Sequence, residues 1–373
     1  MRNRSDSALS TLTGFAIMLM IVSAAYTYMQ VYGVPQMCAS SEIKHFSQVV
    51  DELVELSAKV MYVALTGHGQ SATLHLGGNY PEIPFFSTPP EFSGSITTYD
   101  AEVRILNAVA VDEDVREVWN GVNNPVLKGS CLLYEPTAIF GPPQQARWEY
   151  GIVAVGKSTF SFVSSFRIID GREIRIPLLY GNVSESGRTT SLQLAPYSGG
   201  GRGIAVTDNG SPITIELKTS LPLDFWKSYF ESLNSPYVTN VSKSGDYVII
   251  TLSRGVTYTL VGGIAALEPG SSPPHYLYRI SPRVAVAPAT LAVEVRDSYN
   301  SPVSGVNVTF EVLSGTVTLT DGRNSSRILT VASNDAGIAA VVAESGSGDV
   351  SASIVRPDGS TFEVTFYLRP ASP

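Results

Sequence analysis

The sequence predicts a mainly β protein with one long N-terminal α-helix, and three observations lead to that prediction. An uncharged stretch extends from Ser7 to Ser41, and a charged amphipathic segment follows it directly. From Ser71 onward, short apolar runs alternate with polar residues and are separated by turn signals. Only 16% of residues are charged, and 32 glycines and 23 prolines are present, which suits strands and turns better than helices.

The first expected element is an apolar helix over residues 9–34. About 20 apolar residues at 1.5 Å each cross a hydrocarbon core of about 30 Å, so this segment is long enough for a membrane. Arg2 and Arg4 precede it, and the positive-inside rule therefore places residues 1–8 in the cytoplasm and the bulk of the chain outside. Aromatic rings favour the headgroup layer, and three tyrosines stand near the outer end: Tyr26, Tyr28 and Tyr32.

A cleaved secretory signal is the main alternative for this segment. Such signals have an apolar core of about 7 to 15 residues that ends at a small-residue cleavage site. The apolar run here is longer, although residues 23–25 (Ser-Ala-Ala) form a weak cleavage site. We therefore expect a retained single-pass anchor.

Residues 35–66 are predicted to form an amphipathic helix, with Ser41 as its N-cap and Glu42 in its first turn. Gly67 suits the left-handed position that ends such a helix. Six apolar residues recur at spacings of three and four: Phe46, Val49, Leu53, Leu56, Val60 and Val63.

This apolar seam has two interpretations. It packs against the chain's own β domain, which we expect, or it packs between subunits. The apolar and amphipathic helices can also form one long rod, with a bend at Gly33 and Pro35.

Residues 67–265 are predicted to form an extracellular β-rich domain. An Asp170-Gly171 dipeptide indicates a hairpin with a type I′ turn. Helices are expected at 223–233 and, shorter, from Asp112 to Trp119. Nine segments are expected to be strands: 71–77, 93–106, 150–155, 158–169, 172–181, 191–196, 212–219, 246–253 and 256–263.

The remaining chain reads as a proline-rich linker, 266–283, and a sandwich domain, 284–373. Seven short strands at spacings of about ten residues have the rhythm of an immunoglobulin-like fold. The Cys-Trp-Cys core of antibody domains is absent from the sequence, which excludes that type. The strands are expected at 290–297, 306–315, 316–320, 327–333, 336–345, 349–357 and 361–368.

Three stretches carry a family resemblance: 45–98, 149–195, and 219–230 with 254–261. The first holds a Leu-Gly-x-x-Tyr-Pro turn at 76–81 and a Pro-Pro-x-x-Ser-Gly sequence at 89–94. Together they resemble archaeal membrane-anchored, pilin-like surface proteins, best known from haloarchaea, over about residues 9–265.

The C-terminal part separately resembles the invasin-type bacterial Ig-like repeat. It has the Asp, Asn-x-Pro and Gly of that repeat at Asp297, Asn300, Pro302 and Gly305, and its later turn at 334–337.

These resemblances imply a non-enzymatic archaeal cell-surface protein that displays adhesion or envelope-interaction domains, either as a minor pilin or as a single-pass anchor. One alternative is a major type IV pilin-like filament subunit located in an extracellular pilus. An alternative from another class is an extracellular glycan-binding or hydrolytic protein. That alternative requires two carboxylates, or a nucleophile and a base, in one cleft between Ser71 and Gly263.

The implied partners are a lipid bilayer or neighbouring subunits around the N-terminal helix, self-assembly into a filament, and envelope or surface ligands. No cofactor is expected. The net charge of -8 and the lack of a Lys/Arg cluster argue against nucleic acid. The chain departs from pilin signals, because Arg4 is followed by residues 5–8 (Ser-Asp-Ser-Ala) and no Glu occurs early in the apolar segment. Cleavage near Ala8, before the apolar segment, is a third possibility for the N-terminus and would indicate processing by a prepilin peptidase.

The predicted outer part contains two kinds of candidate modification site. Cys38 and Cys131 either form a disulfide, which an oxidising compartment permits, or remain buried thiols. Five asparagines stand in N-x-S/T sequons and are candidates for glycosylation: Asn182, Asn240, Asn307, Asn324 and Asn209, the last weakened by Pro212.

Several motifs suggest chemistry but have a simpler interpretation. Residues 151–158 match a P-loop pattern, yet β-branched residues and a following strand favour a hairpin turn. The glycine-rich stretch 198–203 lacks a strand-helix context. The four histidines, His45, His68, His75 and His275, show no zinc-site spacing. The acidic residues 112–114 suit a helix start, and calcium at Asp321 or Asp335 lacks a supporting repeat.

Overall fold

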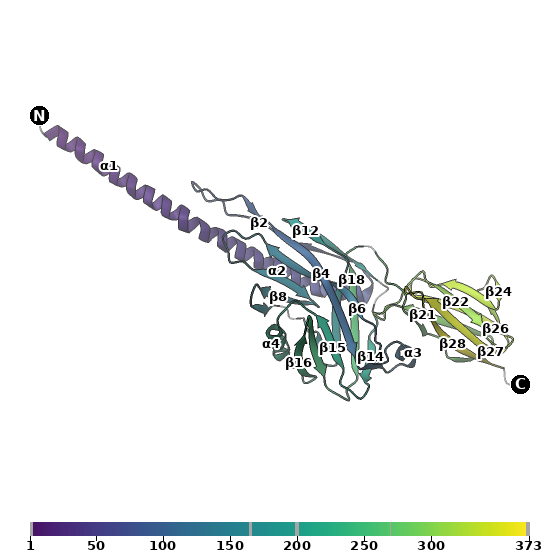
Figure 1. The fold of residues 1–373 in the computed structure, drawn as a ribbon. Coiled ribbons are helices and arrows are strands. Elements are labelled where there is room, and N and C mark those ends of the chain that lie inside the picture. Colours follow the sequence, from purple (N-terminus) through teal and green to yellow (C-terminus); the bar gives the residue numbers. More distant parts are fainter. Residues whose placement is uncertain (1–2, 164–165, 198–200, 269, 371–373) are drawn as a thin grey trace.

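A computed structural model describes residues 3–163, 166–197, 201–268 and 270–370, with side chains from Leu12 onward. A long helix leads into a β-rich middle part, and a smaller two-sheet unit follows at the opposite end (Figure 1). The predicted class, mainly β with one long N-terminal helix, is confirmed.

The N-terminal helix is continuous from Asn3 to Thr66. Its parts are α1 (Asn3–Tyr28), a π-helical turn (Met29–Gly33) and α2 (Val34–Thr66). The irregular turn lies directly before Pro35, whose missing N–H disturbs the ordinary hydrogen-bond pattern. Gly67 ends the helix with φ 71°, as predicted.

The predicted helix start at Ser41 is wrong. The chain is already helical there, and the Ser41 hydroxyl donates to the Met37 carbonyl oxygen one turn earlier, at 3.1 Å. A capping residue needs non-helical backbone, which the preceding turn does not allow here. Glu42 is therefore inside the helix and away from any terminus.

The middle part is built around one branched 16-stranded sheet, and β2 and β3 pair with each other in a separate two-stranded sheet. The main path of the 16-stranded sheet runs β1-β13-β18-β11-β6-β4-β15-β17-β16, and the β11–β18 pair is parallel. The strands from β1 to β9 are β1 (Gln70–Leu74), β2 (Gly78–Asn79), β3 (Glu91–Phe92), β4 (Gly94–Leu106), β5 (Ala108–Ala110), β6 (Leu127–Pro136), β7 (Gln145–Glu149), β8 (Ile152–Gly156) and β9 (Phe160–Phe162). The others are β10 (Ile169–Asp170), β11 (Glu173–Tyr180), β12 (Ser184–Gly187), β13 (Thr190–Pro196), β14 (Ile204–Asp208), β15 (Thr214–Lys218), β16 (Val238–Ser244), β17 (Tyr247–Leu252) and β18 (Tyr258–Ala266).

Every expected strand segment of the middle part contains a strand, although 158–169 supplies only the short β9 and β10. The helices α3 (Glu113–Arg116) and α4 (Leu223–Leu233) also form where expected, and Asp112 caps α3. The hairpin β10–β11 forms too, but Asp170 pairs with Glu173. The turn is therefore Gly171-Arg172, with φ 60° at Gly171, and not the predicted Asp-Gly pair.

Helix α2 packs against this sheet. All six residues of the apolar seam are buried, and α2 contacts β1, β8, β11, β13 and β18. A Cβ atom on Gly263 of β18 would lie 2.9 Å from the Ala64 side chain, so glycine permits this close approach. The seam thus packs against the chain's own β part, as expected.

The C-terminal unit consists of two five-stranded sheets. Their orders are β19-β21-β26-β23-β24 and β20-β28-β27-β22-β25. The strands are β19 (Tyr276–Arg279), β20 (Val284–Val286), β21 (Ala289–Arg296), β22 (Asn307–Val312), β23 (Thr318–Thr320), β24 (Ser325–Ser326), β25 (Ile328–Ala332), β26 (Ile338–Ser345), β27 (Gly348–Val355) and β28 (Thr361–Arg369). All seven expected strands form, and β19 lies inside the segment expected to be a linker.

Direct contacts join this unit to the middle part. Tyr299 donates its hydroxyl to the Lys128 carbonyl oxygen, and the Asn300 amide donates to the Arg202 carbonyl oxygen at 2.8 Å. Arg279 forms a largely buried ion pair with Asp114. Buried polar contacts of this kind hold the two parts in one orientation.

Candidate functional site

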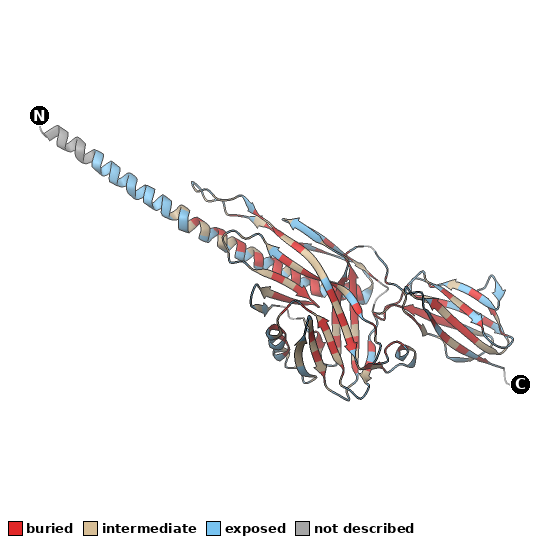
Figure 2. Cartoon of the chain, viewed as in Figure 1, coloured by how far each residue is buried: buried red, intermediate tan, exposed pale blue. Residues whose placement is uncertain are grey.

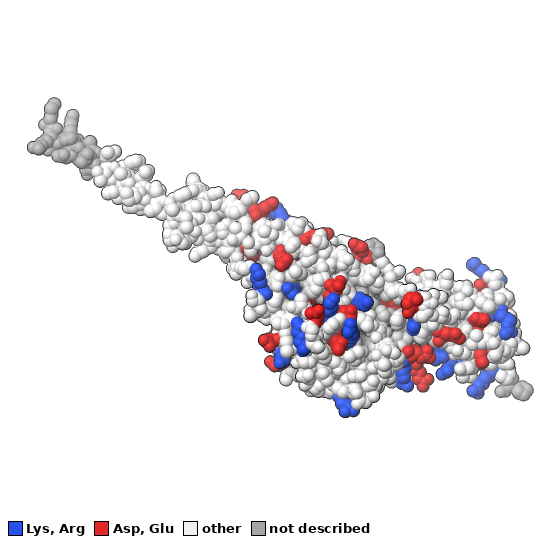
Figure 3. All heavy atoms as spheres, viewed as in Figure 1, with Lys and Arg blue, Asp and Glu red and all other residues white. Residues whose placement is uncertain are grey.

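The most prominent unexplained surface is the N-terminal helix. Every residue from Leu12 to Tyr28 is exposed, and this part projects away from the β-rich body (Figure 2). The exposed side chains include Phe15 at 64% and Met20 at 70% of their full accessible area. Leu12 to Tyr28 contains no charged residue, and this part of the helix shows neither blue nor red in Figure 3. An apolar surface of this size is covered by lipid or by protein in a stable molecule.

By length and composition, this helix can cross a membrane. Leu12–Thr66 is the one such helix among the residues with described side chains, and none of its most apolar window is buried. A core helix of a soluble protein would be mostly buried. The exposure therefore distinguishes this helix from that class, while its N-terminal position is shared with signal sequences.

A loop from the β part runs alongside the exposed helix. It spans residues 80–90, between β2 and β3, and is called here the 80–90 loop. Phe86 stacks on Tyr26 with ring centroids 5.0 Å apart. The Gln30 side chain donates to the Ser87 carbonyl oxygen at 2.9 Å and accepts from the Ser87 N–H at 3.2 Å. The loop is thereby attached to the helix outside the β part.

Phe85, next to this stack, has an unusual backbone. Its φ is 70°, a region that bulky residues rarely adopt, and its side chain is 91% exposed. We expect Phe85→Asn to raise the free energy of unfolding by about 1 kcal/mol, because asparagine tolerates this conformation better. Chemical denaturation tests this result. The matched control is Phe86→Asn, which loses the Tyr26 stack and lowers stability. A decrease for both variants would contradict strain at Phe85.

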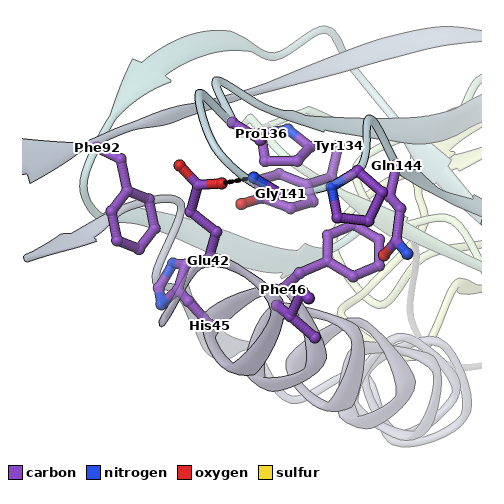
Figure 4. A pocket seen from close by; sticks show the side chains of 11 residues that line it. Glu42, His45, Phe46, Phe92, Tyr134, Pro136, Gly141 and Gln144 are labelled. Carbon is purple, nitrogen blue, oxygen red and sulfur yellow. Dashed lines mark hydrogen bonds between the residues drawn. The ribbon is translucent and has the colours of Figure 1, made fainter. Parts of the chain in front are cut away.

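Glu42 lies at the base of the exposed helix and is 6% exposed. Its carboxylate accepts from the Tyr80 hydroxyl and from the backbone N–H groups of Ile139, Phe140 and Gly141. Figure 4 shows the Glu42 side chain directed at the Gly141 backbone beside Phe92 and Tyr134. Burial and the hydrogen bond to Glu42 raise the pKa of Tyr80, so this phenol remains a donor at neutral pH. The carboxylate joins helix, 80–90 loop and the 139–141 turn.

The cavity beside Glu42 is too small for a substrate. Its volume is about 10 Å³, room for about one water molecule. Glu42 therefore acts as a structural acceptor. Sequence reasoning missed it, although the buried stripe Val34, Cys38, Glu42, Phe46 already shows a charged residue at helical spacing in an apolar row.

His45 faces Phe92 in the same region, with ring centroids 5.2 Å apart, and the charged or titratable groups near it are Glu52 and His75. Burial lowers the pKa of His45, and burial with nearby Arg356 lowers the pKa of His275. Both histidines are thus held neutral in the folded state. Their contribution to stability is present above pH 6.5 and is lost as the pH falls through the lowered folded-state pKa values.

We therefore expect the free energy of unfolding to decrease between pH 7 and pH 5, partly through these two groups. Denaturation at several pH values measures the slope. The double variant His45→Gln, His275→Gln should show a smaller slope, and an unchanged slope would exclude both histidines as its source.

Of the two alternatives for the cysteines, the structure has the free thiols. Cys38 and Cys131 are free buried thiols that belong to different core clusters, one beside the 80–90 loop and one within β6. Burial and the nearby Glu149 carboxylate raise the pKa of Cys131 well above its usual value, so its thiol remains protonated. Glu149 itself is fully buried and accepts from Tyr99 and from Ser220.

All five sequon asparagines are exposed. Asn182, Asn240 and Asn307 lie on or beside strands, and Asn209 and Asn324 lie in turns. Each of these surfaces is accessible to a modifying enzyme, and glycosylation stays a prediction. Asn240 borders an open groove of about 490 Å³ between α4 and β16.

The other motifs occupy ordinary structural positions. The P-loop pattern is the hairpin β8–β9, and no helix follows it. His75 contacts Glu52 at 2.6 Å, and Asp321 accepts from the backbone of its own turn. Among residues with described side chains, no cluster of three or more His, Cys, Asp or Glu could hold a metal ion. Residues 198–200 of the glycine-rich stretch lie outside the described residues.

One hollow meets part of the requirement for a hydrolytic site. It has a volume of about 160 Å³ and is lined by Asp100, Asp246, Lys218 and Ser220 among others. Asp100 is 92% exposed and lies 3.8 Å from the Lys218 ammonium group. Solvent screens charges at such an open position, whereas general acid–base catalysis relies on desolvated groups. The hollow therefore does not resemble a catalytic centre.

Comparison with known proteins finds a similarity to an archaeal protein. No protein-family model matches the sequence. An uncharacterized protein of Archaeoglobus fulgidus is 24% identical over 334 residues, which cover 83% of this chain and 54% of the relative. The chain thus spans about half the length of the curated relative that it matches. The relative's description assigns no activity to the surfaces described above.

Proposed function

We propose that this chain is a non-enzymatic archaeal cell-surface protein, pilin-like in its organisation, that its N-terminal helix anchors in the membrane. The observation that carries the proposal is the contrast along one continuous helix. Its second half buries one face in the chain's own β part, whereas Leu12 to Tyr28 is mostly apolar, uncharged and exposed. Lipid is the covering that suits such a surface, because water would leave it unpartnered.

The two β parts are then displayed on the outer side as an adhesion or envelope-interaction unit, with the Ig-like module farthest from the helix. The similarity to a protein of Archaeoglobus fulgidus supports an archaeal origin for this chain. The exposed sequons are compatible with an extracellular surface. A filament subunit would bury the same apolar half among neighbouring helices. Anchor and filament therefore differ in what covers Leu12 to Tyr28.

The test compares the full chain with Met20→Arg and its control Met20→Leu. A charge at the centre of a spanning helix costs about 2.5–3.5 kcal/mol, so the arginine variant should lose most of its integration into membranes. Alkaline extraction of membranes separates integrated from peripheral protein, and external protease reports the side on which the β parts lie. Equal extraction of all three proteins would contradict an anchor.

The state of the N-terminus distinguishes anchor from filament subunit. Intact-mass analysis with N-terminal sequencing should find a start at residue 1 or 2 for a retained anchor. A start near Leu9 would indicate pilin-type processing and favour the filament. Added mass at the sequons would report glycans in the same measurement.

A further inference from the structure

We propose that the tip of the 80–90 loop, which carries the exposed Phe85, inserts into the outward-facing interface of the membrane beside the helix. It forms a second lipid contact that sets the height and rotation of the β parts. This inference rests on the proposed anchoring function and goes beyond it, because the helix alone leaves rotation about its own axis free.

The position of the loop is the first argument. Val34 is the first helix residue that the β part buries, and Phe86 stacks on Tyr26, eight residues earlier in the chain. At 1.5 Å per residue, the loop extends about 12 Å along the helix beyond the β part. At the level of Tyr26 the helix is exposed on its other sides. A membrane that covers the helix from its N-terminal side up to this level reaches the loop tip as well.

The composition of the loop is the second argument. Residues 83–90 carry no charge, and the nearest charged residues, Glu82 and Glu91, stand at the two ends of this stretch. The tip lies at the level of Tyr26, within the three tyrosines of the outer helix end. Aromatic rings partition into the headgroup layer. The aromatic rings of the loop tip and of the helix therefore lie at the same height relative to the bilayer.

The conformation of Phe85 is the third argument. Its side chain is 91% exposed although its backbone adopts a positive φ that disfavours a large residue. The fold of the described residues thus gives no packing reason for an aromatic ring at this position. The loop itself is held in place by Gln30 and by the Phe86 stack, so the ring projects from a fixed base.

Lipid suits this ring better than a second copy of the chain. One projecting side chain offers far less area than the roughly 1,200 Å² or more that a specific protein interface buries. A bilayer accepts a single ring without any complementary surface. The expected occupant is therefore the boundary between headgroups and acyl chains.

Tryptophan fluorescence in vesicles tests the insertion. The full chain carrying Phe85→Trp is reconstituted into phosphatidylcholine vesicles with and without lipids brominated near the headgroup end of the acyl chain. The matched control is Val122→Trp. Val122 is 74% exposed and follows α3, which lies at the end of the β part remote from α1 (Figure 1). The three native tryptophans are fully buried, and the wild-type signal is subtracted.

We expect brominated lipid to lower the emission of residue 85 about two-fold, because interfacial rings lie about 5–10 Å into the headgroup and acyl boundary. The emission at residue 122 should not change. If the emission of residue 85 is the same with and without brominated lipid, while the protein still floats with the vesicles, insertion is overturned and the anchor stays intact. Blue-shifted but unquenched emission that depends on protein concentration would indicate a second copy and also overturn it.

Protein that does not float with the vesicles would instead contradict the anchor itself. Thermal unfolding of both tryptophan variants confirms that each is folded. A Phe85→Asn chain supplies a second variant, which should float as the wild type does. With either lipid its emission should equal that of the wild type, because it carries no tryptophan at the tip. If brominated lipid lowers the emission of this chain, the lipid quenches a native tryptophan, and the quenching cannot be assigned to residue 85.

Discussion

Leu53→Ala is expected to lower the free energy of unfolding by about 2–5 kcal/mol. Leu53 is completely buried at the centre of the α2 seam, where the helix contacts the sheet. Removing its side chain leaves a cavity that close-packed strands fill poorly. Denaturant unfolding followed by far-ultraviolet circular dichroism measures the loss.

The matched control lies on the same helix. Tyr62 is 46% exposed, and Tyr62→Ala should change stability by about 1 kcal/mol or less. The loss at Leu53 should also be independent of protein concentration, because the seam packs within one chain. A loss that grows on dilution would show that neighbouring chains cover the seam.

Glu42→Ala is the second substitution with a large expected effect, and it should lower the free energy of unfolding by about 3–5 kcal/mol. The substitution removes the acceptor for the Tyr80 hydroxyl and for the N–H groups of residues 139–141. A buried donor left without a partner costs about 1–3 kcal/mol, and relaxation or water recovers part of the total. Glu42→Gln, which keeps one acceptor oxygen, should lose less.

Hydrogen exchange locates the effect. The amides of Ile139, Phe140 and Gly141 should exchange faster in Glu42→Ala, while those of the C-terminal unit stay protected. The control is Glu55→Ala, since Glu55 is 64% exposed and its pair with Lys59 spans one helical turn. Such pairs contribute about 0.5 kcal/mol or less. Equal losses for both variants would contradict the role of Glu42.

Elements defined by local pattern were predicted well. Helix α4, the end of α2 at Gly67 and the seven expected C-terminal strands follow from periodicity and turn residues alone. The central strand β6 (Leu127–Pro136) was missed, and its burial does not alternate regularly along the strand. A central strand lacks the alternation that marks a half-exposed one. Short strands such as β12 and β14 carry too few residues for any period.

The candidate site residues also divide into those that the sequence could indicate and those that only the fold reveals. Exposure of the sequons could be anticipated, because such sequences favour surfaces, whereas the pairing of two cysteines could not be decided from their number. The role of Glu42 depends on contacts with residues distant in sequence, and the position of Phe85 depends on the contacts that hold its loop to the helix. Only the helical stripe that contains Glu42 gave any local signal.

The sequence by itself determined the class of the molecule and the character of its first helix. An uncharged run long enough to cross a membrane, followed by alternating apolar segments, can be recognised without tertiary information, because hydrophobic period and length are local properties. The tertiary structure decided which half of the helix the protein covers, since burial depends on the strands that close around α2. It also decided that a loop accompanies the exposed half, because Tyr26 and Phe86 meet only when the β part is folded.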